Sequence, residues 1–150
     1  MNQFRESPFA HPSVTYRKIL IEKYGGYRNG NFPEDYELWL RWLSKGVKME
    51  KVNQILVDWF DSKERMSRTS PRYSQDAFQK IKSYYLRTWI KQKFGDSKKI
   101  TAWGCGKVAK KQATYLFENG INITSFYEVD CKKIGPVSYT HLTLPTNTVV

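Results

Sequence analysis

The sequence predicts an α/β fold, and three observations carry this prediction. Large apolar residues recur at helical spacing over residues 31–43 and again over residues 71–94, which predicts two amphipathic helices. Over residues 97–129, a β-rich run, a glycine-rich turn, a helical stretch and a second β-rich run follow in the order of one βαβ unit. Helices that alternate with strands in this way are typical of α/β proteins.

The composition is that of a folded protein. At 150 residues, with 40% hydrophobic and 15% aromatic residues, the chain suits one modest domain or pieces of two. Cys105 and Cys131 lie far apart without a CxxC spacing, which argues against a disulfide framework or a zinc site. No apolar run is long enough to cross a bilayer, and the first residues lack the apolar core of a signal peptide. We therefore expect a cytoplasmic location.

The net charge of +11 lies mainly in the second half of the chain. Residues 1–70 carry 12 Lys/Arg against 9 Asp/Glu, and residues 71–150 carry 13 against 5. This excess fits a solvated lysine-rich surface, or contact with the anionic inner face of a membrane. Nucleic acid is the weaker alternative, because no zinc finger, RNA-recognition signature or helix-turn-helix pattern accompanies the charge.

The helix over residues 31–43 has a clear predicted start. Asn31 is the predicted N-cap, Glu34 three residues later completes a capping box, and Pro33 suits a first turn. Lys45 and Gly46 supply a cation and a glycine at its end.

Asp35 lies on the apolar face of this predicted helix. At i, i+3, i+4 and i+7 it shares that face with three large apolar residues, Leu38, Trp39 and Trp42, so its carboxylate is expected to face a cleft or the interior. Glu37 and Arg41, four residues apart, are predicted to form an exposed structural pair. Helix capping and a favourable dipole interaction are the alternative explanation of Glu34 and Asp35.

Four motifs in the first seventy residues occur together in an order that resembles a known family. They are Phe9-Ala10-His11-Pro12-Ser13-Val14, Arg17-Lys18, Gly25-Gly26-Tyr27-Arg28 and Glu34-Asp35-Tyr36-Glu37-Leu38-Trp39-Leu40-Arg41. This stretch resembles the C-terminal half of the catalytic domain of family 2 glycosyltransferases, which are inverting enzymes of the GT-A type. The resemblance implies transfer of a sugar from a nucleotide-sugar donor to a glycan or lipid-linked acceptor.

The resemblance also implies roles for individual residues. Asp35 would be the general base that deprotonates the acceptor hydroxyl, and Glu34 would orient the acceptor or cap the helix. His11 would contact acceptor or donor phosphate, with a plain hydrogen-bonding histidine as the alternative. Arg65 or Arg68 would neutralise a nucleotide phosphate, unless the two lie in a solvated loop.

The resemblance implies a divalent cation, Mg or Mn, for the complete enzyme. The acidic Asp-x-Asp motif that holds it in the family is missing from this sequence, so we name no metal ligand here. We therefore expect a fragment with a truncated start and no catalytic activity on its own, because the half that binds the donor is missing.

Two further strands and one short helix are predicted in this region. His11-Pro12-Ser13-Val14-Thr15-Tyr16 reads as a strand, with a helix from Arg17 to about Tyr24 that Gly25-Gly26 ends. Ile55-Leu56-Val57-Asp58-Trp59-Phe60 is predicted as a strand of a sheet near the site.

The βαβ unit carries a dinucleotide fingerprint. A strand over residues 99–103 precedes Gly104-Cys105-Gly106, a helix runs to about Phe117, and a second strand spans residues 122–129. The unit resembles an incomplete Rossmann-like domain appended to such transferases. Gly104 and Gly106 would approach a cofactor, and Asp130 or Glu128 would bind a ribose hydroxyl, although one βαβ half makes no complete dinucleotide site.

We predict four segments. Residues 1–70 form the C-terminal part of the catalytic domain, residues 71–96 form a connecting helix, residues 97–135 form the truncated Rossmann-like unit, and residues 136–150 form a non-native tail. We expect the connecting helix to pack on the catalytic part, with a membrane surface as the alternative. The tail resembles a translated sequencing adapter, so its His141 is excluded as a functional residue. The competing function is a nucleotide-binding or interaction module built from the basic helix and the Gly104-Cys105-Gly106 turn.

Overall fold

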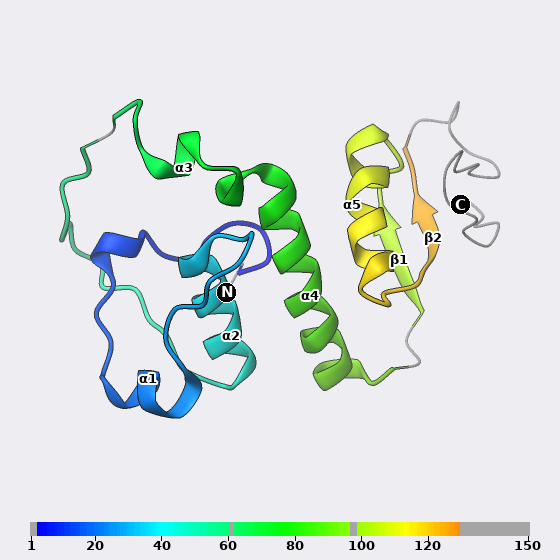
Figure 1. Ribbon diagram of the computed structural model, residues 1–150. Coiled ribbons are helices and arrows are strands. Elements are labelled where there is room, and N and C mark those ends of the chain that lie inside the picture. Colours follow the sequence, from blue (N-terminus) through cyan, green and yellow to red (C-terminus); the bar gives the residue numbers. More distant parts are fainter. Residues whose placement is uncertain (1–2, 61, 97–98, 130–150) are drawn as a thin grey trace. The chain divides into compact units, whose positions relative to one another are not determined.

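The structure is a computed structural model that describes residues 3–60, 62–96 and 99–129. The chain divides into two compact units, Met1–Leu86 and Arg87–Val150, and the division falls inside the long helix α4 (Figure 1). Asp130, Cys131 and the tail at 136–150 lie outside the described residues. Helices together with a parallel strand pair agree with the predicted α/β class.

The first unit is built mainly from helices. Its elements are η1 (His11–Ser13), α1 (Ile19–Tyr24), α2 (Glu34–Ser44), α3 (Met66–Thr69), η2 (Pro71–Tyr73) and the first part of α4 (Gln75–Phe94). Seven consecutive residues of α2, from Tyr36 to Trp42, are buried. The helix predicted over 31–43 is therefore the centre of this unit's core.

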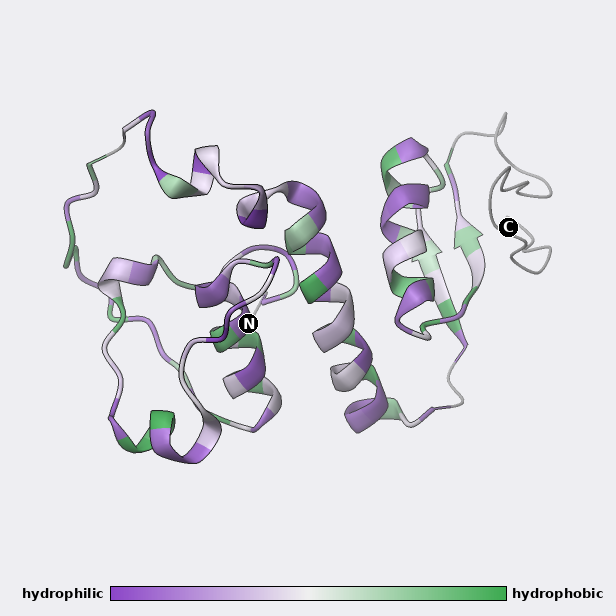
Figure 2. Cartoon of the chain, viewed as in Figure 1, coloured by the Kyte–Doolittle hydropathy of each residue, from purple (hydrophilic) through white to green (hydrophobic). Residues whose placement is uncertain are grey.

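Two apolar clusters cover different sides of α2. Leu38, Trp39 and Trp42 pack against residues before and after the helix, namely Phe9, Val14, Tyr16, Leu20, Ile21, Tyr24, Val47 and Met49. Tyr36 and Leu40 pack against Tyr85 of α4. Figure 2 shows hydrophobic and hydrophilic residues interleaved along α4, as suits a helix with one packed side. The prediction that this helix packs on the preceding part of the chain is confirmed for its first three turns.

The predicted start of α2 is wrong in detail. Pro33, and not Asn31, is the N-cap, and no side chain caps the helix from that position. Glu34 is therefore the first helical residue and closes no capping box. Pro33 has an extended backbone and no N–H, so the helix begins directly after it. A local bond replaces the cap, because the Tyr36 N–H donates to Asp35 Oδ1 at 2.7 Å.

Two predicted strands are absent from the described residues. His11–Ser13 form a short 3-10 helix, closed by a bond from the Ser13 N–H to the Ala10 carbonyl, with Pro12 in its first turn. Residues 55–60 are exposed and form neither helix nor strand. A strand needs a partner for its backbone groups, and no described segment pairs with either stretch. The prediction of a glycine end to α1 is confirmed, since Gly25 follows it with φ of 79°.

The second unit contains the predicted βαβ arrangement. Its elements after α4 are β1 (Ile100–Trp103), α5 (Lys107–Glu118) and β2 (Ile123–Tyr127), and the two strands pair in parallel. A small core gathers Cys105, Ala113, Ile123 and Phe126, with Ile100, Ala102 and Leu116 packed against it. Gly120, with φ of 74°, follows the end of α5, as its position in the sequence predicts.

Among the described residues, no helix combines the length and the apolar character needed to span a membrane.

Candidate active site

Asp35 lies in the first turn of α2 with its carboxylate partly shielded. Its side chain is 20% exposed, and Oδ1 accepts the Tyr36 N–H while Oδ2 lies 4.0 Å from Nδ1 of His11. The start of a helix also favours negative charge there. The carboxylate is thus bonded at one oxygen, while the other lies beside His11 and the side chain remains partly exposed, which suits a proton acceptor.

His11 is brought to Asp35 from η1, 24 residues earlier in the chain. Its Nε2 lies 2.8 Å from the hydroxyl of Tyr27, and its ring meets Trp39 edge to face at 6.3 Å between centroids. The ring is therefore bordered by an acid, a phenol and an indole. Two of the predicted site residues, Asp35 and His11, are neighbours in the structure.

Glu34 turns to a different set of partners. Its Oε1 accepts the hydroxyl of Tyr73 at 2.5 Å, and its Oε2 lies 3.6 Å from a guanidinium nitrogen of Arg72. Burial, the bond to Glu34 and the negative charges of Glu34 and Asp35 raise the pKa of Tyr73. The second oxygen of Glu34, Oε2, is buried and has no hydrogen-bond partner. Glu34 therefore ties η2 to the start of α2 and retains one oxygen for a donor group.

Glu37 and Arg41 form a buried ion pair, so the prediction of an exposed pair is wrong. Glu37 is 2% exposed and Arg41 is 4% exposed, with Arg41 Nε 3.0 Å from Glu37 Oε1. Tyr85 of α4 donates its hydroxyl to the same carboxylate at 2.6 Å, and Arg28 approaches it at 3.6 Å. The i, i+4 spacing identified the partners, but α4 covers this side of α2 and excludes water.

Arg41 also holds the loop that follows α1. Its guanidinium donates to three successive backbone carbonyls, those of Tyr24, Gly25 (3.0 Å) and Gly26 (2.6 Å). The indole N–H of Trp42 donates to the Gly25 carbonyl as well, at 3.1 Å. These bonds join the loop to the core helix, and the next residue in the loop is Tyr27.

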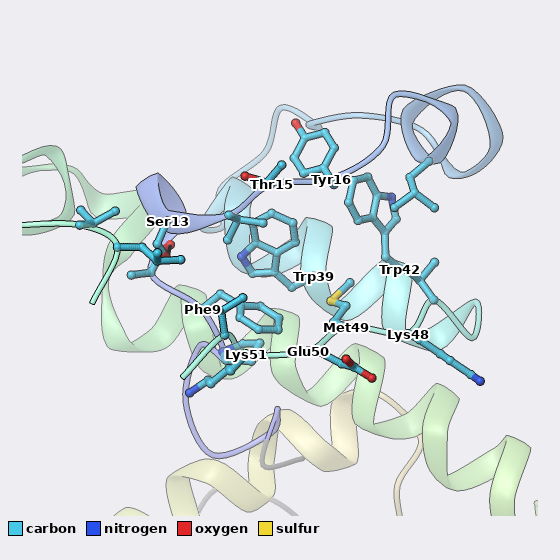
Figure 3. A pocket seen from close by; sticks show the side chains of 18 of the residues that line it. Phe9, Ser13, Thr15, Tyr16, Trp39, Trp42, Lys48, Met49, Glu50 and Lys51 are labelled. Atoms are coloured by element: carbon cyan, nitrogen blue, oxygen red, sulfur yellow. Dashed lines mark hydrogen bonds between the residues drawn. The ribbon is translucent and has the colours of Figure 1, made fainter. Parts of the chain in front are cut away.

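A cavity of about 860 Å³ lies beside α2. Figure 3 shows Trp39 and Trp42 of α2 in its lining together with Phe9, Tyr16 and Met49. Asp35 and His11 do not line it, and Trp39 is the residue that joins the two places through its ring contact with His11. The indole nitrogen of Trp39 is buried without a hydrogen-bond partner, which leaves a donor beside the cavity. The aromatic side chains share the lining of this aromatic cavity with charged ones, among them Lys48, Glu50 and Lys51.

Arg65, one of the two predicted phosphate-binding arginines, packs on an aromatic ring. The guanidinium of Arg65 lies over the ring of Trp59, 4.4 Å from its centroid, and Arg68 is an exposed residue of α3. Their role in phosphate binding stays a prediction. Arg72, which the sequence analysis did not single out, approaches the carboxylate of Glu34.

The described residues form no metal site made of protein ligands alone. Within residues 3–60, 62–96 and 99–129, no three His, Cys, Asp or Glu side chains gather around one point.

The glycine-rich turn of the second unit is closed by an internal carboxylate. Gly104 has φ of 85° and Gly106 is the N-cap of α5, as suits a phosphate-binding turn. However, both the N–H and the thiol of Cys105 donate to Glu128 Oε2 at 3.0 Å. The position where a phosphate would bind the Cys105 N–H is thus occupied by Glu128, and binding of a dinucleotide stays a prediction.

Comparison with known proteins shows a consistent set of relatives. The chain is 45% identical over 62 residues to the Escherichia coli UDP-Gal:alpha-D-GlcNAc-diphosphoundecaprenol beta-1,3-galactosyltransferase, a match that covers 41% of this chain and 22% of that protein. It is 32% identical over 87 residues to an O-antigen biosynthesis glycosyltransferase of Escherichia coli, covering 57% and 32%. An amylovoran biosynthesis glycosyltransferase of Erwinia amylovora is 35% identical over 52 residues, covering 35% and 20%. These relatives are all glycosyltransferases.

The matches support the interpretation of the chain as part of a glycosyltransferase. The chain spans between a fifth and a third of the length of these glycosyltransferase relatives. No protein-family model matches it. No solved structure matches it either.

Proposed function

We propose that this chain is the acceptor-side part of an inverting, family 2 glycosyltransferase of the GT-A type, with Asp35 as general base. The observation that carries the proposal is the geometry of Asp35. One of its oxygens is fixed by the Tyr36 N–H, and the other lies beside His11 at a partly shielded position. The names of the relatives supply the reaction class, transfer of a glycosyl group.

In this proposal Asp35 removes the proton from the acceptor hydroxyl as that oxygen attacks the anomeric carbon. The bond from that carbon to the nucleotide diphosphate breaks, and the diphosphate leaves with the electron pair on the opposite side. His11 contacts the acceptor or a phosphate, and Glu34 orients the acceptor indirectly, by holding Tyr73 and Arg72 at the start of α2. Arg65 and Arg68 remain proposed contacts of the nucleotide phosphates.

The acceptor is proposed to be a glycan or a lipid-linked sugar. The Escherichia coli galactosyltransferase is named for an acceptor that carries a diphosphoundecaprenol, and the amylovoran enzyme is named for a polysaccharide. The aromatic cavity next to Trp39 is suited to the apolar faces of sugars or to a lipid chain. Contact with the inner face of the membrane, and a cytoplasmic location, fit such an acceptor and the basic second half of the chain.

The complete enzyme is proposed to use a divalent cation, Mg or Mn, to hold the donor diphosphate. Its protein ligands are proposed to lie mostly in other segments of that enzyme, since no group of three or more ligands gathers among the described residues. The Rossmann-like unit is proposed as an appended domain, and nothing in its closed turn favours the competing function of a nucleotide-binding module.

The test uses a longer protein that carries this sequence, with UDP-galactose and a GlcNAc-diphospholipid as the first donor and acceptor. Asp35→Asn is expected to lower kcat by about 10²- to 10⁴-fold, the usual contribution of a general base, and to leave donor binding unchanged. Glu34→Gln is the matched control, since its amide oxygen still accepts the Tyr73 hydroxyl and the loss should stay below about tenfold. Turnover of Asp35→Asn close to that of the parent protein would refute the assignment.

A further inference from the structure

Tyr27 contacts the proposed site, although its place in the Gly25-Gly26-Tyr27-Arg28 motif assigned it no role there. It lies in the loop after α1, and its hydroxyl is 2.8 Å from Nε2 of His11, with ring centroids 5.4 Å apart. Arg41 fixes the three residues before it through their carbonyls. The position of Tyr27 is therefore set by the buried core of the unit.

The other nitrogen of His11 faces the proposed base. Nδ1 is 4.0 Å from Oδ2 of Asp35, and Trp39 meets the imidazole edge to face. The distance of 4.0 Å is longer than a hydrogen bond, so the interaction joins an N–H dipole to a carboxylate charge. The imidazole thus lies between a phenol on one side and an acid on the other.

This arrangement selects one form of the neutral imidazole ring. Neutral histidine has one N–H donor and one acceptor nitrogen, and the hydrogen bonds of the ring decide which nitrogen is which. The Tyr27 hydroxyl can donate to an unprotonated Nε2 or accept from Nε2–H, and donation leaves the imidazole proton on Nδ1, towards Asp35. The opposite tautomer would turn a lone pair of Nδ1 towards a negative carboxylate. The charge of Asp35 therefore favours the Nδ1–H tautomer, in which Tyr27 is the donor to Nε2.

The Tyr27 hydroxyl has two side-chain partners, His11 and Tyr16. Burial first, then the bond and charge of Tyr16, and finally the negative charges of Asp35 and Glu34 raise its pKa. The phenol therefore keeps its proton at neutral pH, and because it has only one, donation to His11 makes Tyr16 the donor in the other bond. Tyr16 also lines the aromatic cavity, so the polar groups continue from Asp35 towards it.

We propose that Tyr27 is a positioning residue that holds His11 as the Nδ1–H tautomer and thereby orients the carboxylate of Asp35. This inference rests on the proposed function, in which Asp35 is the base. Oδ1 is bonded to the Tyr36 N–H, and the attraction between Nδ1–H and Oδ2 favours the same orientation of the carboxylate. Tyr27 acts through His11 and does not touch the reacting atoms.

The tautomer can be measured on the 150-residue chain without substrate. The sequence has two histidines, His11 and His141, so ¹⁵N labelling of histidine gives two rings, and His141→Gln assigns them. Long-range ¹H–¹⁵N correlation spectra, recorded at a pH where both rings are neutral, identify the protonated nitrogen of each. We expect Nδ1 of His11 to carry the proton. A proton on Nε2 would overturn the proposal.

Substitutions then show which neighbour sets the tautomer. Tyr27→Phe is expected to shift His11 towards the Nε2–H form, whereas Tyr127→Phe, the same change in the second unit, leaves the ring unchanged. Two outcomes would overturn the role of Tyr27. One is that the His11 resonances do not change in Tyr27→Phe, and the other is that the Nδ1–H tautomer is lost in Asp35→Asn but kept in Tyr27→Phe. If Tyr27→Phe fails to fold, 3-fluorotyrosine at position 27 replaces it. This stronger donor must move the Nε2 resonance, and an unmoved resonance overturns the proposal.

The two proposals fail in different measurements. In the longer protein, Tyr27→Phe is expected to lower kcat about fivefold with KM unchanged, as for the loss of one neutral hydrogen bond. If Asp35→Asn retains turnover while the tautomer is as expected, the proposed function fails and the contact stands. If His11 carries its proton on Nε2 while Asp35→Asn is inactive, the role of Tyr27 fails and the proposed function stands.

Discussion

Removal of the Arg41 guanidinium is expected to destabilise the first unit strongly. Arg41→Met keeps most of the side-chain volume but leaves the carboxylate of Glu37 buried without its main partner. Breaking a buried ion pair from one side costs about 3–5 kcal/mol. The carbonyls of Tyr24 and Gly26 lose their Arg41 donor as well, although they lie closer to solvent, while the Gly25 carbonyl keeps the indole N–H of Trp42. Tyr85 and Arg28 still approach Glu37, so we expect the lower end of the range, about 3 kcal/mol.

Urea unfolding, followed at Trp42, measures this loss of stability in the first unit. The indole N–H of Trp42 donates to the Gly25 carbonyl, so its NMR cross-peak reports on the joined loop and helix. With a urea dependence of about 1 kcal/mol per molar for a unit of this size, a loss of about 3 kcal/mol lowers the midpoint by about 3 M. Arg28→Met is the matched control, because Arg28 approaches the same carboxylate from an exposed position. Its effect should stay below about 1 kcal/mol.

A double variant separates the buried charge from packing. Adding Glu37→Gln to Arg41→Met removes the unpaired charge, so the double variant should be no less stable than Arg41→Met alone. Equal midpoints for Arg41→Met and Arg28→Met would refute the reasoning, as would additive losses in the double variant.

Two further predictions concern the same unit. Burial raises the pKa of Tyr36 from 10.0 to about 12, so the folded state retains a proton that the unfolded chain releases above pH 10. Stability is therefore unaffected below pH 10 and falls between pH 10 and about 12, by up to about 1.4 kcal/mol per pH unit. Urea midpoints should show this fall, and Tyr36→Phe should reduce it; an equally steep fall in that variant would contradict the assignment. Gly25→Ala should lower the free energy of unfolding of the first unit by about 1–3 kcal/mol, because φ is 79° and a Cβ would lie 3.2 Å from the Arg41 guanidinium. Gly106→Ala, with φ of −65° and no atom within 4 Å of the new Cβ, should cost less than about 1 kcal/mol in the second unit, and equal losses would contradict the argument.

The sequence by itself determined the elements that depend on local periodicity. The apolar spacing of residues 38–42 predicted α2, and the strand, glycine turn and helix after residue 99 predicted the βαβ unit. It also placed Asp35 on a helix face next to aromatic residues. These features need only the neighbours along the chain, since side chains three and four residues apart share a helix face whatever surrounds them.

Only the tertiary structure decided how those elements are used. Spacing paired Glu37 with Arg41, but α4 and the loop after α1 determine that the pair is buried. No pattern in the sequence linked Tyr27 to His11, because their contact depends on a loop that Arg41 holds from another helix. The strand predicted at 55–60 did not form, because strand pairing depends on a partner segment, whereas a helix satisfies its backbone within itself.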